Sequence, residues 1–340
     1  MRVEAKCPSN IALVKYWGKK DVQLPLNPSV SFTLSKAITS TSISFRPSST
    51  FSFEFLFSGQ KQPSFEPKIQ HFFNLIRPEI EDLNSFHLTI ESSNNFPHSS
   101  GIASSASAFG ALAIALAEWQ RSLKNLNQID LNLASQIARM GSGSAARSVW
   151  PYASLWGMHS EILNSSDLYA RPIGDFLHPI FKDYKDYIFL VDVGQKKVSS
   201  SQGHSLMTAH PFAKARIEQA FQNIPYLMDI LKSGDLIKFI SLIESEALTL
   251  HALMLSANKP YILMKPGTLA IIDAIWDYRQ QSGCPVCFTL DAGANVHMLF
   301  PASYEMEMKK FSDEVLSSYC SSGRYLCDEV GTGPTWQTHL

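Results

Sequence analysis

The sequence predicts a two-domain α/β protein. Its 340 residues are 45% hydrophobic, which is enough for a large core and more than one core usually holds. The early part of the chain alternates in the manner of β-strands, whereas helical patterns and short apolar strands interleave later. We therefore expect a β-rich domain over residues 1–181 and an α/β domain over residues 182–340, with the boundary near Phe181.

Strands are expected first and helices after them in the N-terminal domain. The predicted strands are Arg2–Pro8, Ser31–Phe45 and Phe51–Phe57. The predicted helices are Gly101–Gln120 and Leu131–Met140. The uncharged stretch from Ser99 to Ala117 reaches membrane-spanning length, but it consists mainly of Ala, Ser and Gly. We therefore expect a helix that is buried in protein.

Helices and strands alternate in the C-terminal domain. After an irregular segment with Pro172, Gly174 and Pro179, strands are predicted over Tyr187–Val193 and Pro285–Leu290. The predicted helices are Pro211–Lys232, Leu236–Leu255, Thr268–Gln281 and Glu305–Ser318. This interleaving predicts a second α/β layer structure.

Charge and cysteine content exclude several classes of function. Lysine and arginine number 29 and aspartate and glutamate 30, without long runs of one sign, so no nucleic-acid or membrane partner is expected. The start of the chain lacks the pattern of a secretory signal, and the five cysteines make an odd count, so we expect reduced thiols in the cytoplasm. Cys284 and Cys287 are expected to be buried thiols, because no second CxxC completes a zinc site.

A loop of small residues precedes the first predicted helix. It reads NNFPHSSGIASS from Asn94 to Ser105. Unpaired backbone N–H groups, the helix dipole and the hydroxyls of Ser104 and Ser105 can surround a phosphate there. On its own, the segment is explained equally well as an ordinary Ser-capped helix.

Two further segments carry clustered cations. Lys15, Tyr16 and Lys19 lie in the stretch CPSNIALVKYWGKKD, which indicates either an anion site or a solvated strand end. In GSGSAARS, from 141 to 148, Arg147 is a lone cation among glycines and serines. It can grip a carboxylate with its planar fork, or form a structural ion pair or cap.

The remaining candidates are a carboxylate and a loop. Asp291 follows a short apolar strand and precedes a turn with Gly293, so it either faces a cleft and deprotonates a substrate hydroxyl or caps the turn. The loop KKVSSSQGH, from 196 to 204, is rich in hydroxyls and cations.

Taken together and in this order, these segments resemble the mevalonate diphosphate decarboxylase family of the GHMP kinase superfamily. The matching segments are SNIALVKYWGKKD, NNFPHSSGIASSASAFGAL, GSGSAARS, KKVSSSQGH, LDAGAN and VGTGP. The resemblance implies a ribosomal-protein-like N-terminal domain and a ferredoxin-like C-terminal domain, with the active site in the cleft between them. It also implies that ATP phosphorylates the 3-hydroxyl of mevalonate 5-diphosphate, and that loss of phosphate and CO2 gives isopentenyl diphosphate.

The resemblance assigns roles to residues of this chain. It implies that Asp291 orients or deprotonates the 3-hydroxyl, Lys15 stabilises the transferred charge and Arg147 fixes the carboxylate. The implied substrate-binding residues are Asn10, Tyr16, Lys19, Ser142, Ser144, Arg147, Ser200 and Ser201. The implied ATP-binding residues are Pro97, Gly101, Ala103, Ser104 and Ser105, with Mg²⁺ held by Ser104 or Ser105 and the ATP phosphates.

The resemblance also implies a homodimer. Two alternatives to the decarboxylase stay open. One is a related GHMP enzyme that acts on mevalonate or its 5-phosphate, as a kinase or a phosphomevalonate decarboxylase. The other is a non-catalytic metabolite sensor on the same fold, which would be expected to lose Asp291 or the Ser104–Ser105 loop, and this chain has both.

Overall fold

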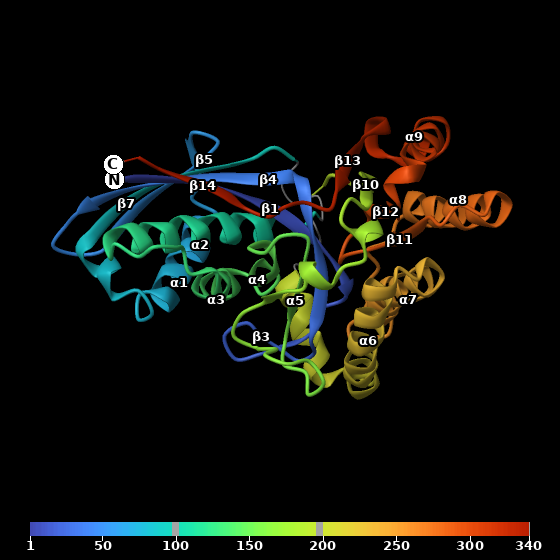
Figure 1. Ribbon diagram of the computed structural model, residues 1–340, viewed down its shortest axis with the longest axis horizontal. Coiled ribbons are helices and arrows are strands. Elements are labelled where there is room, and N and C mark those ends of the chain that lie inside the picture. Colours follow the sequence, from blue (N-terminus) through green and yellow to red (C-terminus); the bar gives the residue numbers. More distant parts are fainter. Residues whose placement is uncertain (97–101, 195–199, 340) are drawn as a thin grey trace.

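A computed structural model describes residues 1–96, 102–194 and 200–339, with the backbone alone at residues 200–202. Figure 1 shows an elongated sheet with helices beneath it, and a second group of strands and helices at one end of that sheet. The mixed α/β fold predicted from the sequence is confirmed.

The larger sheet is mainly antiparallel. Within the described residues it has eight strands, with the order β14-β1-β4-β7-β5-β6, and β8 and β9 continue from β4. Among these pairs, β5 and β7 run parallel. The strands are β1 (Arg2–Val14), β4 (Ser29–Pro47), β5 (Ser52–Phe57), β6 (Gln60–Lys61), β7 (Phe86–Asn94), β8 (Ala153–Trp156), β9 (Arg171–Pro172) and β14 (Thr335–His339).

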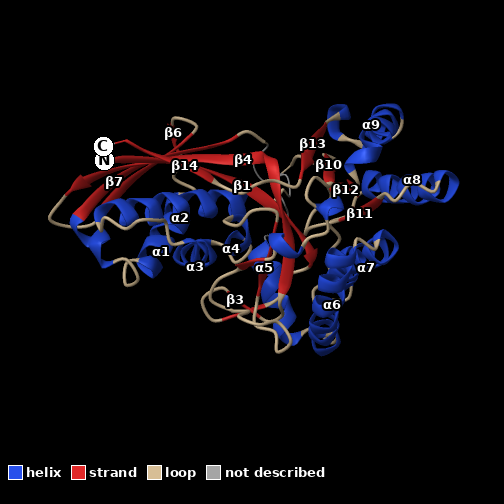
Figure 2. Ribbon diagram, viewed as in Figure 1, coloured by secondary structure: helices blue, strands red, loops and turns tan. Residues whose placement is uncertain are grey.

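Helices cover one face of this sheet (Figure 2). They are α1 (Glu66–Ile76), α2 (Ser104–Leu123), α3 (Leu131–Gly141) and α4 (Ala145–Ser148). Every residue of α2 from Phe109 to Gln120 is buried, which confirms the prediction of a helix enclosed by protein. A Cβ at Gly110 would collide with the sulfur of Cys7 on β1, so a glycine is needed for α2 to lie this close to the sheet.

The second sheet has the order β11-β12-β10-β13 and is antiparallel. Its strands are β10 (Lys185–Phe189), β11 (Cys287–Thr289), β12 (Val296–Phe300) and β13 (Tyr325–Glu329). The helices of this half are α5 (Ser200–Leu206), α6 (Ala213–Ser233), α7 (Leu236–Leu255), α8 (Pro266–Ser282) and α9 (Glu305–Glu314). A two-stranded hairpin, β2 (Lys19–Lys20) and β3 (Leu24–Pro25), links β1 to β4.

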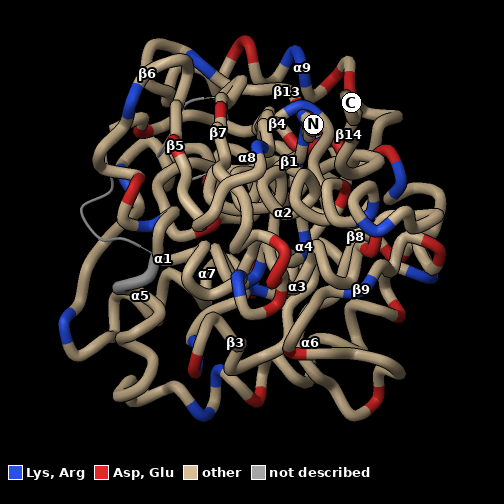
Figure 3. Tube along the Cα trace, turned by 90° about the vertical axis from the view of Figure 1, so that its left-hand side faces the viewer, with Lys and Arg blue, Asp and Glu red and all other residues tan. Residues whose placement is uncertain are grey.

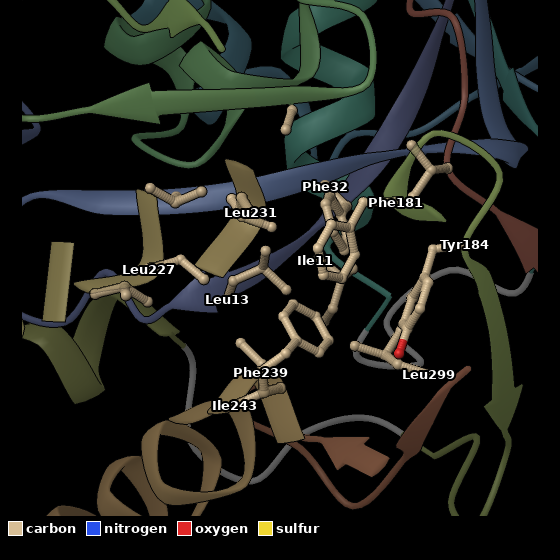
Figure 4. Packing of buried hydrophobic residues seen from close by; sticks show 14 of the residues in the cluster. Ile11, Leu13, Phe32, Phe181, Tyr184, Leu227, Leu231, Phe239, Ile243 and Leu299 are labelled. Atoms are coloured by element: carbon tan, nitrogen blue, oxygen red, sulfur yellow. The ribbon is translucent and has the colours of Figure 1, made fainter. Parts of the chain in front are cut away.

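One hydrophobic core joins the two halves of the chain. Figure 4 shows Phe32 of β4 beside Phe181 and Phe239, with Ile11 and Leu13 of β1 in the same cluster. The ring centroids of Phe32 lie 6.1 Å from those of both Phe181 and Phe239. Side chains from the first sheet and from α7 are therefore held at fixed relative positions by buried apolar contacts.

The chain also returns to the first sheet at its end. β14 pairs with β1 from Arg2 opposite His339 to Lys6 opposite Thr335. The domain boundary near Phe181 stays a prediction. The pairing of β14 with β1 shows that a strand from the second half of the chain completes the first sheet.

Several predicted elements are confirmed, and others change in extent. Helix α7 has the predicted bounds, Leu236–Leu255. β1 continues beyond the predicted Pro8 to Val14, because register shifts at Pro8/Asn10 and Ala12/Val14 keep it paired with β4. The strand predicted over Tyr187–Val193 is wrong at its end, since its pairing with β12 and β13 stops at Phe189. The elements α1, β7, β12, β13 and β14 were not predicted from the sequence.

The charges of both signs are interspersed over the periphery of the chain trace (Figure 3). No helix in the described ranges is long and apolar enough to span a bilayer. All five cysteines are free thiols, and Cys284 and Cys287 are buried as predicted.

Candidate active site

A cavity of about 270 Å³ lies where the end of β1, the start of α2, the segment leading into α4 and the turn after β11 meet. Most of the predicted site residues line it: Asn10, Lys15, Tyr16, Lys19, Ala103, Ser105, Ser142, Ser144, Arg147 and Asp291. Ser104 lines an adjoining cavity instead. Pro97 and Gly101 lie outside the described residues, as do the side chains of Ser200 and Ser201.

The path of β1 places its functional residues. Its two register shifts fall immediately before Asn10 and between Ala12 and Val14, just ahead of Lys15. Bulges of this kind bend a strand and redirect its side chains. Asn10 of β1 and Lys15, the residue that follows β1, therefore both reach the cavity although they are five positions apart.

Lys15 and Asp291 form an ion pair in the cavity wall. The Lys15 Nζ lies 3.1 Å from Asp291 Oδ1 and donates a second hydrogen bond of 2.7 Å to the carbonyl of Ala12. Burial lowers the pKa of Lys15, and the neighbouring Asp291 and Glu246 oppose that shift. An ammonium has three N–H donors, and the residues that the structure describes occupy two of those of Lys15, so the third is available to a ligand.

A buried ion pair fixes the backbone of Lys15. The Glu246 carboxylate on α7 accepts hydrogen bonds from Arg216 of α6 at 2.8 and 2.7 Å and from the Lys15 N–H at 2.9 Å. Arg216 also donates to the Lys15 carbonyl at 3.0 Å, and Asn223 donates to Glu246 at 2.6 Å. The second half of the chain thus holds both backbone groups of the residue that carries the cavity lysine.

Arg147 is held by neutral groups alone in the described part of the chain. Its guanidinium donates to the hydroxyls of Ser31 and, at 2.6 Å, Ser29, and lies 3.5 Å from Asn10 Oδ1. Burial lowers its pKa to about 10, which Asp291 and Tyr16 partly oppose, so it is charged at neutral pH. No described carboxylate forms an ion pair with it, which leaves a desolvated positive charge facing the cavity.

Hydroxyl groups connect the start of α2 with α4. The Ser142 Oγ lies 3.1 Å from Ser105 Oγ and 3.4 Å from Ser144 Oγ. Asn10 holds this segment in place, because its amide donates to the Ser144 carbonyl at 3.0 Å and to Ser148 Oγ at 2.7 Å. The row of hydroxyls offers donors and acceptors along one wall of the cavity.

The start of α2 is suited to phosphate binding. Ala103 adopts a left-handed conformation (φ 39°, ψ 41°) just before the helix, and no side chain of the described residues caps the first N–H groups. Such strain in a non-glycine residue is one feature that recurs at functional sites. The described residues contain no cluster of three or more acidic, His or Cys side chains, so a cation here would rely on a serine hydroxyl and on ligand phosphates.

Aromatic rings form another wall. The Tyr16 ring centroid lies 4.8 Å from that of Trp156 and 4.3 Å from that of His204, and its buried hydroxyl has no hydrogen-bond partner among the described residues. Burial raises the pKa of Tyr16 far above its usual range, so the hydroxyl is neutral. A Cβ at Gly143 would approach that hydroxyl to 2.8 Å, so this glycine makes room for it.

Several residues in or behind the cavity wall were not named as site residues from the sequence. Lys68 of α1 and His204 line the cavity, and Ser29, Ser31 and Glu246 support it from behind. Ser29 and Ser31 carried a usable signal, because they alternate with the apolar Val30 and Phe32 and therefore share one face of a strand. Lys68 and Glu246 carried none, since only tertiary packing brings them to the site.

Comparison with known proteins identifies the family. Residues 7–170 match the diphosphomevalonate decarboxylase-like N-terminal domain, and residues 187–330 match the mevalonate 5-diphosphate decarboxylase C-terminal domain. The diphosphomevalonate decarboxylase of Candida albicans is 30% identical over 98% of this chain and 89% of its own length. The Saccharomyces cerevisiae enzyme of the same name is 30% identical over 92% of this chain and 81% of its own length.

Solved structures that resemble this chain belong to the same family. Mevalonate diphosphate decarboxylase from Staphylococcus aureus superposes with a TM-score of 0.85 and 28% identity, over 99% of this chain and 98% of that one. A complex of MDDEF with MVAPP, AMPPCP and magnesium gives a TM-score of 0.83 and 28% identity, over 100% and 99% of the two chains. The cavity described above thus lies in a chain that belongs to the diphosphomevalonate decarboxylase family.

Proposed function

We propose that this protein catalyses the ATP-dependent decarboxylation of mevalonate 5-diphosphate to isopentenyl diphosphate, with release of ADP, phosphate and CO2. Membership of the family supports the proposal. The observation that carries it is the arrangement of two cations in one cavity: Lys15 is paired with Asp291, and Arg147 is left without a carboxylate in the described residues. A kinase needs the first group, and a decarboxylase needs both.

Phosphoryl transfer is assigned to the Lys15–Asp291 pair. As the substrate 3-hydroxyl attacks the γ-phosphorus of ATP, Asp291 accepts the hydroxyl proton, and the bond from phosphorus to the ADP oxygen breaks. Lys15, at 3.1 Å from Asp291, stabilises the negative charge that builds up around the transferred group. The products of this step are ADP and a 3-phosphorylated substrate.

Decarboxylation is assigned to Arg147. When the 3-phosphate leaves with the electron pair of its C–O bond, the tertiary carbon becomes positive, and the electrons of the adjacent C–C bond move in to form the double bond as CO2 departs. The carboxylate must stay ionised and aligned for this, and a guanidinium with unpaired donors can bind it in that orientation. Asn10, Ser29 and Ser31 hold the guanidinium for the task.

ATP is assigned to the start of α2 and the adjoining cavity. That cavity has a volume of about 170 Å³ and is lined largely by aromatic and aliphatic side chains, including Phe55, Phe57 and Phe109, with Ser104 and Ser105 at one side. We propose that it takes the adenine, while Ala103, Ser104, Ser105, Pro97 and Gly101 bind the phosphates. Mg²⁺, held through Ser104 or Ser105, would bridge and neutralise phosphate oxygens.

The diphosphate end of the substrate is assigned to hydroxyl and cationic groups. These are Tyr16, Lys19, Ser142, Ser144, Ser200 and Ser201. From the resemblance alone, we also propose a homodimer and a cytoplasmic location. Sedimentation equilibrium tests the dimer, and a mass of one chain at micromolar concentration would contradict it.

The decisive test is a product assay. Purified protein is incubated with Mg-ATP and, separately, mevalonate, its 5-phosphate and its 5-diphosphate, and ADP, phosphate and CO2 are measured. Equal amounts of the three products from the diphosphate alone are expected. ADP without CO2 would instead indicate a kinase, CO2 from the monophosphate would change the substrate, and no turnover with any of them would favour a sensor.

A further inference from the structure

His204 contributes an unusual ring to the cavity. It lies on α5, lines the cavity and is only 9% exposed. Its ring centroid lies 4.3 Å from that of Tyr16 and 4.7 Å from that of Trp17. A ring packed in this way has little freedom to rotate, so the direction of each of its nitrogens is set by the surrounding structure.

The backbone determines which nitrogen of His204 carries the proton. The N–H of Gly18 donates a hydrogen bond of 2.9 Å to His204 Nδ1, so Nδ1 must be unprotonated. Burial, followed by the charges of Lys19 and Arg147, lowers the pKa of His204 to about 3. The ring is therefore neutral at physiological pH, and its single proton lies on Nε2.

Among the residues that the structure describes, the His204 ring has one hydrogen-bond partner, the N–H of Gly18, and that bond is made at Nδ1. The Nε2–H donor therefore has no acceptor among these residues. The surrounding cavity wall is cationic, with Lys15, Lys19 and Arg147 lining the same space. An anionic ligand is therefore the acceptor that this environment attracts. A neutral donor is useful beside it, because it satisfies a ligand oxygen without adding to the repulsion among three buried or half-buried cations.

We propose that His204 binds the substrate through its Nε2–H, which donates a hydrogen bond to an oxygen of the diphosphate group. Its neighbours Tyr16 and Lys19 belong to the wall assigned to that end of the substrate. The inference rests on the proposed function for the identity of the ligand. It adds a specificity-determining residue whose tautomer is fixed by the Gly18 N–H, with Gly18 acting as the positioning residue.

Two substitutions separate the nitrogens of the ring. In His204→Asn, the side-chain amide occupies the place of Nδ1, so it can still accept from Gly18 but has nothing at Nε2. In His204→Gln, the amide nitrogen occupies the place of Nε2 and the acceptor for Gly18 is lost. Because a hydrogen bond to a charged group is involved, we expect His204→Asn to raise the KM for mevalonate 5-diphosphate by about 10- to 100-fold.

The other parameters should move little. His204→Gln is expected to raise that KM less than about threefold, and in both variants kcat and the KM for ATP should stay within about threefold of wild type, since the contact is made equally in ground and transition state. A wild-type KM in His204→Asn would overturn the proposal. An equal increase in both variants would also overturn it, because the ring would then serve only as an acceptor for Gly18.

Direct binding separates this inference from the proposed function. Calorimetric titration of wild type and both variants with mevalonate 5-diphosphate in the absence of ATP should reproduce the order seen in KM. If wild type binds the diphosphate but releases no CO2, the proposed function fails while the role of His204 stands.

A spectroscopic measurement keeps the inference testable even if a variant unfolds. In wild-type protein labelled with ¹⁵N-histidine, His204 should show the pattern of a neutral ring protonated at Nε2, both before and after addition of mevalonate 5-diphosphate at pH 7. The ligand should shift its Nε2 resonance most. A ring protonated at Nδ1, or an Nε2 resonance that is unmoved by saturating ligand, would overturn the proposal.

Discussion

Two buried cations line the cavity, Lys15 and Arg147, and they differ in the charge of their partners. Lys15 is 1% exposed and has a carboxylate at 3.1 Å, and Glu246 accepts from its backbone N–H. Arg147 is 2% exposed, yet its described partners are two serine hydroxyls and an asparagine oxygen. Lys15 forms an ion pair with a carboxylate, whereas Arg147 forms none with the residues that the structure describes.

The difference assigns the two groups to different tasks. A compensated cation keeps its acidic partner ionised and in position, which suits proton and phosphoryl transfer. An uncompensated buried cation lowers the stability of the free protein and regains that free energy when an anion binds. Under the proposed function, the Lys15 region suits the chemistry of the substrate hydroxyl, and the Arg147 region suits the binding of its carboxylate.

Removing the carboxylate of the compensated pair should have the largest effect. In Asp291→Asn the proton acceptor is lost while the shape of the side chain remains. Because general base catalysis is removed, we expect kcat for CO2 release to fall by about 10²- to 10⁴-fold. Circular dichroism should show a folded protein, and a rate within tenfold of wild type would contradict the role of Asp291.

The buried Arg216–Glu246 ion pair that holds the Lys15 backbone should matter mainly for stability. Glu246→Gln leaves Arg216 buried without its charged partner, so we expect the free energy of unfolding in urea to fall by about 3–5 kcal/mol. The double variant Glu246→Leu with Arg216→Met removes both charges and serves as the control. It should be more stable than the Glu246→Gln variant, because no uncompensated charge remains, and a double variant that is less stable would contradict this account.

Substitution of Arg147 should lower activity without lowering stability, the reverse of what is expected for Glu246. Arg147→Met removes the donors for the substrate carboxylate, so kcat should fall by about 10²- to 10³-fold. The same change removes a charge that has no described carboxylate, so the free energy of unfolding should be unchanged or higher. Parallel kinetics and urea unfolding check both statements, and a strongly destabilised variant would contradict the second, because Arg147 would then have a charged partner in the folded protein.

Sequence patterns pointed to most of the residues that line the cavity, whose roles stay predictions, and they predicted the confirmed fold class while missing several of its elements. Lys15, Arg147 and Asp291 were found because chemically distinctive residues stand beside glycines, serines and strand ends. Glu246 could not be found in this way, since it belongs to an apolar helix and meets Lys15 231 positions away along the chain. Non-local contacts of this kind leave no trace in local periodicity.

The helices and strands that were not predicted also differ in whether a local pattern marks them. α1 could have been predicted, because Ile69, Phe72, Phe73 and Ile76 follow the helical spacing. β14 could not, because it is a short, mostly exposed strand whose partner is the first strand of the chain. Pairing with β1 decides its conformation, and that pairing depends on the assembled sheet.

A third buried titratable group, His204, extends the comparison of Lys15 and Arg147, and its expected effect on the free energy of unfolding is smaller. Its folded pKa of about 3 lies below the ordinary value of 6.5, so between these values the unfolded chain takes up a proton that the folded protein does not. Stability should therefore fall on acidification through this window, by about 2 kcal/mol between pH 7 and pH 5 from this residue. His204→Gln lacks the group, so the difference in unfolding free energy between wild type and variant should shift by that amount in favour of the variant at pH 5. Urea titrations of both proteins at the two pH values measure this shift. A constant difference would mean that the ring takes up its proton between pH 7 and pH 5 in the folded protein as it does in the unfolded chain, and becomes a third buried cation beside Lys15 and Arg147 at pH 5.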